Sequence, residues 1–226
     1  MELSDCPVCR VCWGPVQAGF VRCYQCDLAR SEAGDLLADA VVLVGYAVRG
    51  EQLATDLRRY KSGRDGAADA ARRLRFMLAA FLREHEASVW RAAGIARAPS
   101  AVAVVPSGQG RSGPHPLTAI VASCVDLPMT QLTVRLPAQP CRRGIITLGW
   151  LDVRGLVAGA DVLLVDDTWV SGGSAQSAAA ALKLAGARKV ALVVLGRHVD
   201  PADPRSAELL RALRLAASPR AGSRPG

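Results

Sequence analysis

The chain has 226 residues and a mass of 23.7 kDa, enough for one ordinary domain with a small appendage. Half of its residues are hydrophobic and 21% are charged, which excludes a largely disordered chain. Aromatic residues make up only 4%, which disfavours modules that stack nucleic-acid bases and favours helices packed on a parallel sheet. The net charge of +8 could steer a phosphorylated substrate or, weakly, nucleic acid toward the protein, although it also serves solubility.

No apolar run approaches the roughly 18 residues of a membrane span, and the N-terminus lacks a signal pattern. We therefore expect a cytoplasmic protein without a membrane partner. In the cytoplasm thiols stay reduced, so the seven cysteines favour metal binding over disulfides.

The first expected element is a cysteine-rich zinc knuckle over residues 1–34. Cys6 and Cys9 form one C-x2-C pair, and Cys23 and Cys26 form a second pair after thirteen intervening residues. Two such pairs can enclose one tetrahedral Zn²⁺ in a structural site. Cys9 and Cys12 are also spaced as C-x2-C, so the register is ambiguous. We prefer the outer register and interpret Cys12 as a spare thiol or packing residue.

An α/β domain is expected over residues 35–215. The β-branched run at residues 40–48 predicts a buried strand, and the patterns at residues 51–61 and 66–83 predict helices. Strands are also expected at residues 101–105 and 129–136, and the polar stretch between residues 137 and 155 is long enough to form a lid.

The second half of this domain contains the clearest topological signal. Residues 161–167 predict a strand, a Gly/Ser loop follows, and a helix over residues 174–185 leads to a strand at 189–196. This order makes a βαβ unit and therefore a parallel sheet. The basic tail at residues 216–226 is expected to be disordered.

A glycine-rich loop follows the strand at residues 101–105. Residues 108–113 match GxGxxG, but the prolines on both sides of His115 interrupt the helix that a dinucleotide site needs. We interpret the loop as a second anion site, with Ser107 and Gly108 in the loop and Arg111 supplying donors. A plain solvent loop is the alternative, and His115 is interpreted as a surface residue.

Paired acids and a phosphate-type loop follow the strand at residues 161–167. Asp166 and Asp167 stand at the expected end of the strand, where ligands bind in open α/β sheets. The loop after them consists of Val170, Ser171, Gly172, Gly173 and Ser174. Its backbone N–H groups, its hydroxyls and the helix N-terminus behind it suit a phosphate, whereas the two acids suit ribose hydroxyls or hydrated Mg²⁺. A 5-phosphorylated ribose satisfies both halves; an ordinary acidic turn is the alternative.

This segment resembles the phosphoribosyl-pyrophosphate signature of type I phosphoribosyltransferases, with Thr168, Trp169 and Val170 departing from the usual residues. With the cysteine knuckle ahead of it, the whole chain resembles the ComF family. The resemblance implies a type I phosphoribosyltransferase-like fold, in which Asp166 and Asp167 hold the ribose diol and residues 170–174 hold the 5-phosphate.

The same resemblance implies a reaction. Phosphoribosyl pyrophosphate would bind with Mg²⁺, its pyrophosphate at the loop containing Arg111, and its phosphoribosyl group would pass to an unidentified acceptor. Arg142 and Arg143, in the possible lid, are candidates to cover the pyrophosphate. The alternative is a non-catalytic ComF-type module for nucleotide sensing or DNA uptake, with weak single-stranded DNA contact or a competence-protein partner.

Overall fold

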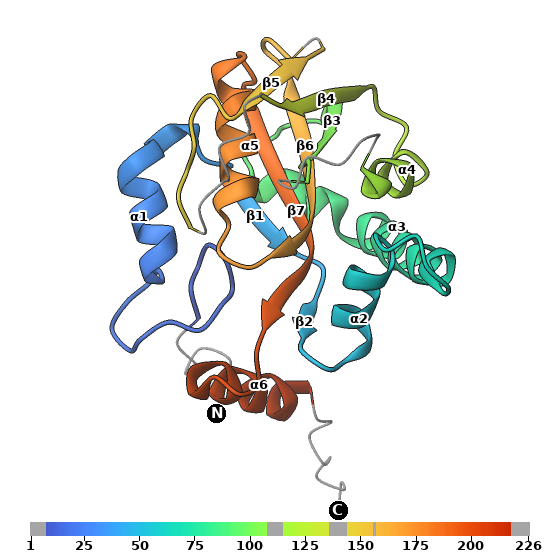
Figure 1. Ribbon diagram of the computed structural model, residues 1–226. Coiled ribbons are helices and arrows are strands. Elements are labelled where there is room, and N and C mark those ends of the chain that lie inside the picture. The colour runs from blue at the N-terminus through green and yellow to red at the C-terminus, as the bar shows by residue number, and fades with distance from the viewer. Residues whose placement is uncertain (1–7, 108–114, 136–143, 156, 218–226) are drawn as a thin grey trace, which may run out of the picture.

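The computed structural model describes residues 8–107, 115–135, 144–155 and 157–217 (Figure 1). Its strands are β1 (Ala40–Leu43), β2 (Tyr46–Val48), β3 (Ala101–Val104), β4 (Met129–Val134), β5 (Leu151–Arg154), β6 (Asp161–Trp169) and β7 (Lys189–Val199). In the described part of the chain they form one seven-stranded sheet in the order β1-β7-β6-β3-β4-β5, and β2 pairs with the end of β7. Every pair is parallel except β4 with β5, so the predicted parallel α/β sheet is confirmed.

Helices cover both faces of this sheet (Figure 1). They are α1 (Tyr24–Ala33), a 3-10 turn η2 (Gly34–Leu36), α2 (Gln52–Arg59), α3 (Ala67–Ala92), α4 (Pro116–Ala122), α5 (Gly173–Leu184) and α6 (Pro204–Ala217). Buried residues of α2, α3 and α4 pack on one face. Those of α5 and of the cysteine-rich segment pack on the other. None of the helices in the described ranges combines the length and the apolar character that a membrane crossing requires.

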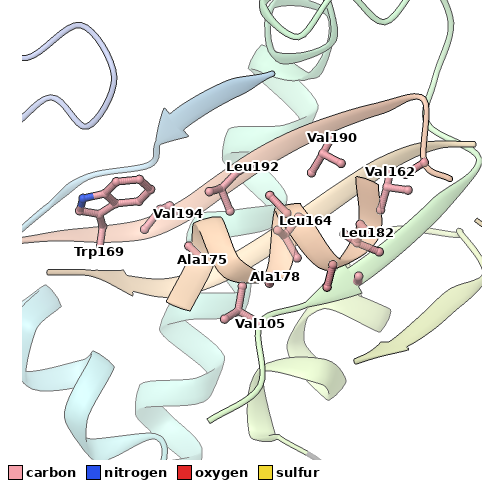
Figure 2. Packing of buried hydrophobic residues seen from close by; sticks show 14 of the residues in the cluster. Val105, Val162, Leu164, Trp169, Ala175, Ala178, Leu182, Val190, Leu192 and Val194 are labelled. Atoms are coloured by element: carbon pink, nitrogen blue, oxygen red, sulfur yellow. The ribbon is translucent and has the colours of Figure 1, made fainter. Parts of the chain in front are cut away.

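The central strand β6 is buried on both faces because its apolar residues run without interruption. Val162 and Leu164 face α5, whereas Leu163 and Val165 face the opposite layer. On α5, alanines such as Ala178 allow the helix to lie close against the sheet (Figure 2). This packing fixes the end of β6 and the start of α5, between which the phosphate-type loop lies.

Four elements differ from the sequence predictions. The strand expected at residues 40–48 is split into β1 and β2, and α3 continues to Ala92. β6 continues two residues past the paired acids to Trp169, because Thr168 and Trp169 pair with β7. β5 lies inside the stretch that was expected to be polar loop, and it pairs antiparallel with β4. The tail expected at residues 216–226 lies outside the described residues after Ala217.

Candidate functional site

The loop of residues 170–174 has the backbone geometry of an anion site. Gly172 is the N-cap of α5 and has a φ of +85°, which favours glycine. In the described part of the chain, no acceptor is found for the backbone N–H groups of residues 171 to 174. These groups and the positive end of the α5 dipole are therefore available to an anion. Ser171 and Ser174 add partly exposed hydroxyls at the same place.

Arg197 on β7 holds the other side of this loop. Its Nη1 donates hydrogen bonds to the carbonyl oxygens of Trp169 at 3.1 Å and Val170 at 2.6 Å. In a trans peptide the C=O and N–H groups point in opposite directions. The N–H groups of Val170 and Ser171 therefore point away from Arg197.

The two acids lie within β6 rather than at its end. Successive side chains of a strand point to opposite faces, so Asp166 lies on the face of α5 and Asp167 on the face of α2. Asp166 Oδ1 accepts a hydrogen bond of 2.9 Å from the backbone N–H of Asp167. The sequence interpretation of a side-by-side pair at the strand end is thus corrected: the carboxylates flank the strand.

Asp167 is the centre of a buried polar cluster that joins three segments. Its side chain is 7% exposed, accepts a hydrogen bond from the Tyr60 hydroxyl and forms an ion pair with Lys61. His115 Nε2 lies 3.9 Å from the same carboxylate oxygen. The prediction that His115 is a surface residue is wrong, since its side chain is 9% exposed. It also caps α4, because Nδ1 accepts from the backbone N–H of Leu117.

Burial, together with the neighbouring charge of Asp167, raises the pKa of Asp166 to about 8. Lys61 opposes both effects. At neutral pH Asp166 is therefore largely a neutral carboxylic acid, which can donate as well as accept a hydrogen bond. A strongly perturbed acid near a loop with unpaired backbone N–H groups is typical of a functional site.

Four cysteines come together at the N-terminal end of the described chain. The sulfur atoms of Cys9, Cys12, Cys23 and Cys26 all lie within 4.8 Å of one another, and three of the four residues are buried. Such a set could hold one tetrahedral zinc ion. The interpretation of Cys12 as a spare thiol is corrected, because its sulfur lies inside the cluster. Cys6, the ligand preferred from the sequence, lies outside the described residues.

The thiols of this cluster are polarised by one another. A hydrogen bond with Cys12 is the main reason that the pKa of Cys23 is lowered to about 6, and the pKa of Cys9 is lowered by the same neighbour. The pKa of Cys12 is raised, mainly by a hydrogen bond with Cys23, and the pKa of Cys26 is raised, mainly by a hydrogen bond with Cys12. Thiolates are the form that binds zinc, so the cluster has the donor chemistry that a metal needs.

Two cavities border this region. One of about 440 Å³ lies beside α1 and α5, reaches residues 171–173 and is also lined by Arg10 and Arg30. The other, of about 420 Å³, is lined by Lys61 and Thr168 next to the acids, together with basic residues of β7 and α2. Both cavities carry cationic side chains, which suits a phosphorylated ligand.

Several residues predicted for the site lie outside the described residues: Gly108, Arg111, Arg142 and Arg143. Ser107 is half-buried in the loop that follows β3, three residues after the strand ends. The sequence reasoning gave no role to Tyr60 or Arg197. Tyr60 is the C-cap residue of α2 and directly precedes Lys61, and this position at the end of an amphipathic helix was the only local signal for it.

Comparison with known proteins gives a likeness of fold alone. No family model and no curated protein matches the chain. A purine phosphoribosyltransferase from Pyrococcus horikoshii Ot3 is similar at 18% identity and a TM-score of 0.34, over 58% of this chain and 88% of that one. An orotate phosphoribosyltransferase from Mycobacterium tuberculosis H37Rv, in complex with 5-phospho-α-D-ribosyl 1-diphosphate, is similar at 22% identity and a TM-score of 0.36, over 66% and 74%. A phosphoribosyltransferase from Corynebacterium diphtheriae is similar at 23% identity and a TM-score of 0.36, over 84% of this chain and 89% of that one. These likenesses carry no argument about function, which depends on the chain's own residues.

Proposed function

We propose that this chain is a phosphoribosyltransferase-like protein of the ComF type, which binds phosphoribosyl pyrophosphate with Mg²⁺ and transfers its phosphoribosyl group to an unidentified acceptor. The observation that carries the proposal is the loop of residues 170–174. The N–H groups of residues 171–174 have no acceptor in the described chain, and the loop leads into α5 a few residues after two acids, one of them strongly perturbed.

The 5-phosphate is the part of the ligand that this loop recognises. A phosphate needs several donors around one anionic centre, and the loop supplies backbone N–H groups, two hydroxyls and the N-terminus of α5. Arg197 contributes indirectly, since it binds the loop carbonyls and leaves the N–H groups facing the ligand.

The ribose lies next to the two acids in this proposal. Asp166 is on the same face of β6 as α5 and its loop, so it is the nearer acceptor for a ribose hydroxyl. Asp167 already binds Tyr60 and Lys61, but a carboxylate has about four lone-pair sites and can accept one more hydrogen bond. Its negative charge would also stabilise positive charge that develops on the ribose ring.

The transfer itself asks for charge stabilisation more than covalent help. The C1–O bond to pyrophosphate breaks while a bond from C1 to the acceptor forms, and pyrophosphate leaves with the bonding electrons. Mg²⁺ suits this site chiefly as a complex with pyrophosphate, because Asp166 is largely neutral and Asp167 is bound to Lys61. The proposal keeps Arg142, Arg143 and the loop with Gly108 and Arg111 as partners of the pyrophosphate.

One observation favours a second candidate, a non-catalytic module that senses a phosphorylated ribose or nucleotide and serves DNA uptake. The Asp167 carboxylate is buried and already carries an ion pair, as in a structural site. The two candidates share the phosphate loop and differ only in turnover. Zinc held by the cysteine cluster and a cytoplasmic location belong to both.

Calorimetric titration with ribose 5-phosphate, and with ribose as the unphosphorylated control, tests the shared part. Ser174 is the second helical residue of α5, where an acidic side chain stabilises the helix but repels a phosphate. We expect Ser174→Asp to keep or raise the melting temperature and to abolish ribose 5-phosphate binding. The uncharged, similarly sized Ser174→Asn should bind measurably. Equal binding by both variants would contradict the phosphate assignment.

Release of pyrophosphate from phosphoribosyl pyrophosphate, measured across a panel of bases and amines with Mg²⁺, separates the two candidates. Turnover with any acceptor supports the transferase. Tight binding without turnover across the panel favours the sensing module.

A further inference from the structure

Arg197 touches the phosphate loop and the cysteine knuckle at the same time. On one side it donates to the carbonyls of Trp169 and Val170. On the other side it lies against Gly14 of the knuckle: a Cβ at Gly14 would stand 2.5 Å from Nη2 and 3.0 Å from Nε of Arg197. A side chain at Gly14 would displace the guanidinium from this position. Gly14 belongs to the turn around the cluster, since its carbonyl accepts from the backbone N–H of Cys9.

Trp169 makes a second connection between the same two parts. This residue immediately precedes the phosphate loop, is 2% exposed, and belongs to the buried cluster that contains Cys9, Cys12 and Cys26. Figure 2 shows its indole at the end of the core, beside Val194 of β7. A side chain at Gly172 would collide with the same ring, so the loop and the ring are packed together.

We call the place where Arg197 and Trp169 connect the cysteine knuckle to the loop of residues 170–174 the joint. Its charges are complementary once the cluster holds a metal. Four thiolates with Zn²⁺ carry a net charge of about −2. Arg197 is half-buried, and its Nε has no hydrogen-bond partner in the described part of the chain. A buried guanidinium needs a nearby negative charge to offset its lost hydration. Zinc bound by the four thiolates would supply that charge, whereas four neutral thiols would not.

We propose that Arg197 is a positioning residue for the phosphate loop and that the zinc-loaded cysteine cluster holds it in place. Binding of a 5-phosphorylated ribose and retention of zinc then stabilise one another. This inference rests on the proposed function for its ligand, but the joint between knuckle and loop is independent of it. The knuckle is consequently part of the working site rather than a separate appendage.

Linkage makes the coupling measurable from the zinc side, because a ligand that stabilises the loop must also stabilise the metal centre. The affinity for zinc is measured by equilibrium competition with a chelator, with and without saturating ribose 5-phosphate. In the wild type we expect ribose 5-phosphate to raise the zinc affinity by about fivefold or more, the lower end of typical couplings. Arg197→Met keeps side-chain length but removes the charge, and it should abolish this rise in affinity while leaving stoichiometric zinc.

Two further variants separate positioning from general destabilisation. Arg211→Met removes an exposed arginine on α6 and should retain the full effect. Arg197→Lys keeps the charge but not the forked geometry and should restore part of the coupling. An undiminished rise in zinc affinity in Arg197→Met would overturn the inference.

Hydrogen exchange tests the joint without a ligand. Removal of zinc should speed exchange in residues 168–175 by about tenfold, with little change in the β7 core at residues 190–195. Equal acceleration in both segments, or none, would overturn the coupling. If ribose 5-phosphate fails to bind the wild type, the proposed function is wrong, and this exchange experiment alone decides the joint.

Discussion

Replacing Gly172 with alanine tests how tightly the phosphate loop is packed on the core. Gly172 has a φ of +85°, and a left-handed conformation costs a residue with a Cβ roughly 1–2 kcal/mol. The new methyl group would also collide with the buried ring of Trp169, which has little room to move because it is 2% exposed. Overpacking of this kind costs about 1–3 kcal/mol. The sum is a loss of about 2–5 kcal/mol in the free energy of unfolding.

Gly50→Ala is the matched control. Gly50 has a similar φ of +92°, but nothing lies within 4 Å of the position of its Cβ. Gly50→Ala should therefore lose only the roughly 1–2 kcal/mol that the left-handed backbone costs. Alanine also lowers the entropy of the unfolded chain, but this effect is the same in both variants. Urea denaturation followed by circular dichroism, with zinc present throughout, gives both values. If Gly172→Ala loses no more stability than Gly50→Ala, Trp169 is not packed beneath the loop.

Other substitutions test the cysteine cluster and the acids. Cys12→Ser should reduce zinc in the purified protein well below one ion per chain by elemental analysis, while Cys124→Ser should not; unchanged zinc in Cys12→Ser would refute the inner register. Because the pKa of Asp166 is raised to about 8, the folded protein keeps a proton that the unfolded chain releases above about pH 4. The free energy of unfolding therefore falls as the pH rises from about 4 to about 8. Asp166→Asn should therefore flatten the melting temperature across this range and raise it at pH 8; an unaltered pH profile would contradict the shift. Tyr60→Phe removes a hydrogen bond to the buried Asp167 carboxylate and should lower the free energy of unfolding, measured by urea denaturation, by about 1.5–3 kcal/mol. A loss below about 0.5 kcal/mol would contradict that bond.

The sheet could be predicted because its signal is local. Uninterrupted apolar runs followed by a glycine-containing loop and an alanine-rich helix specify β6, α5 and β7, and the parallel sheet follows from this strand–helix–strand order. The end of β6 could not be predicted in the same way. Thr168 and Trp169 are in the strand because β7 continues beside them, and that pairing partner lies almost thirty residues away, at Gly196 and Arg197.

The residues of the site also divide into those that could be predicted from a local pattern and those that could not. The loop of residues 170–174 and its acids are contiguous and were found from the sequence. The cluster around Asp167 is not contiguous, since Tyr60 and His115 approach it from α2 and from the start of α4. Neither residue has a local pattern that sets it apart from a core tyrosine or a loop histidine. The cysteine register was undecidable for a related reason: Cys9 shares its spacing with two partners, and only the fold brings Cys12 to Cys23 at 3.7 Å.

The most direct test of the account is a crystal structure of the zinc-loaded protein with ribose 5-phosphate. We predict that the phosphate lies within hydrogen-bond distance of the backbone N–H groups of residues 171–174, with the ribose hydroxyls toward Asp166. A phosphate bound elsewhere, for example against Arg10 and Arg30 in the cavity beside α1, would contradict it.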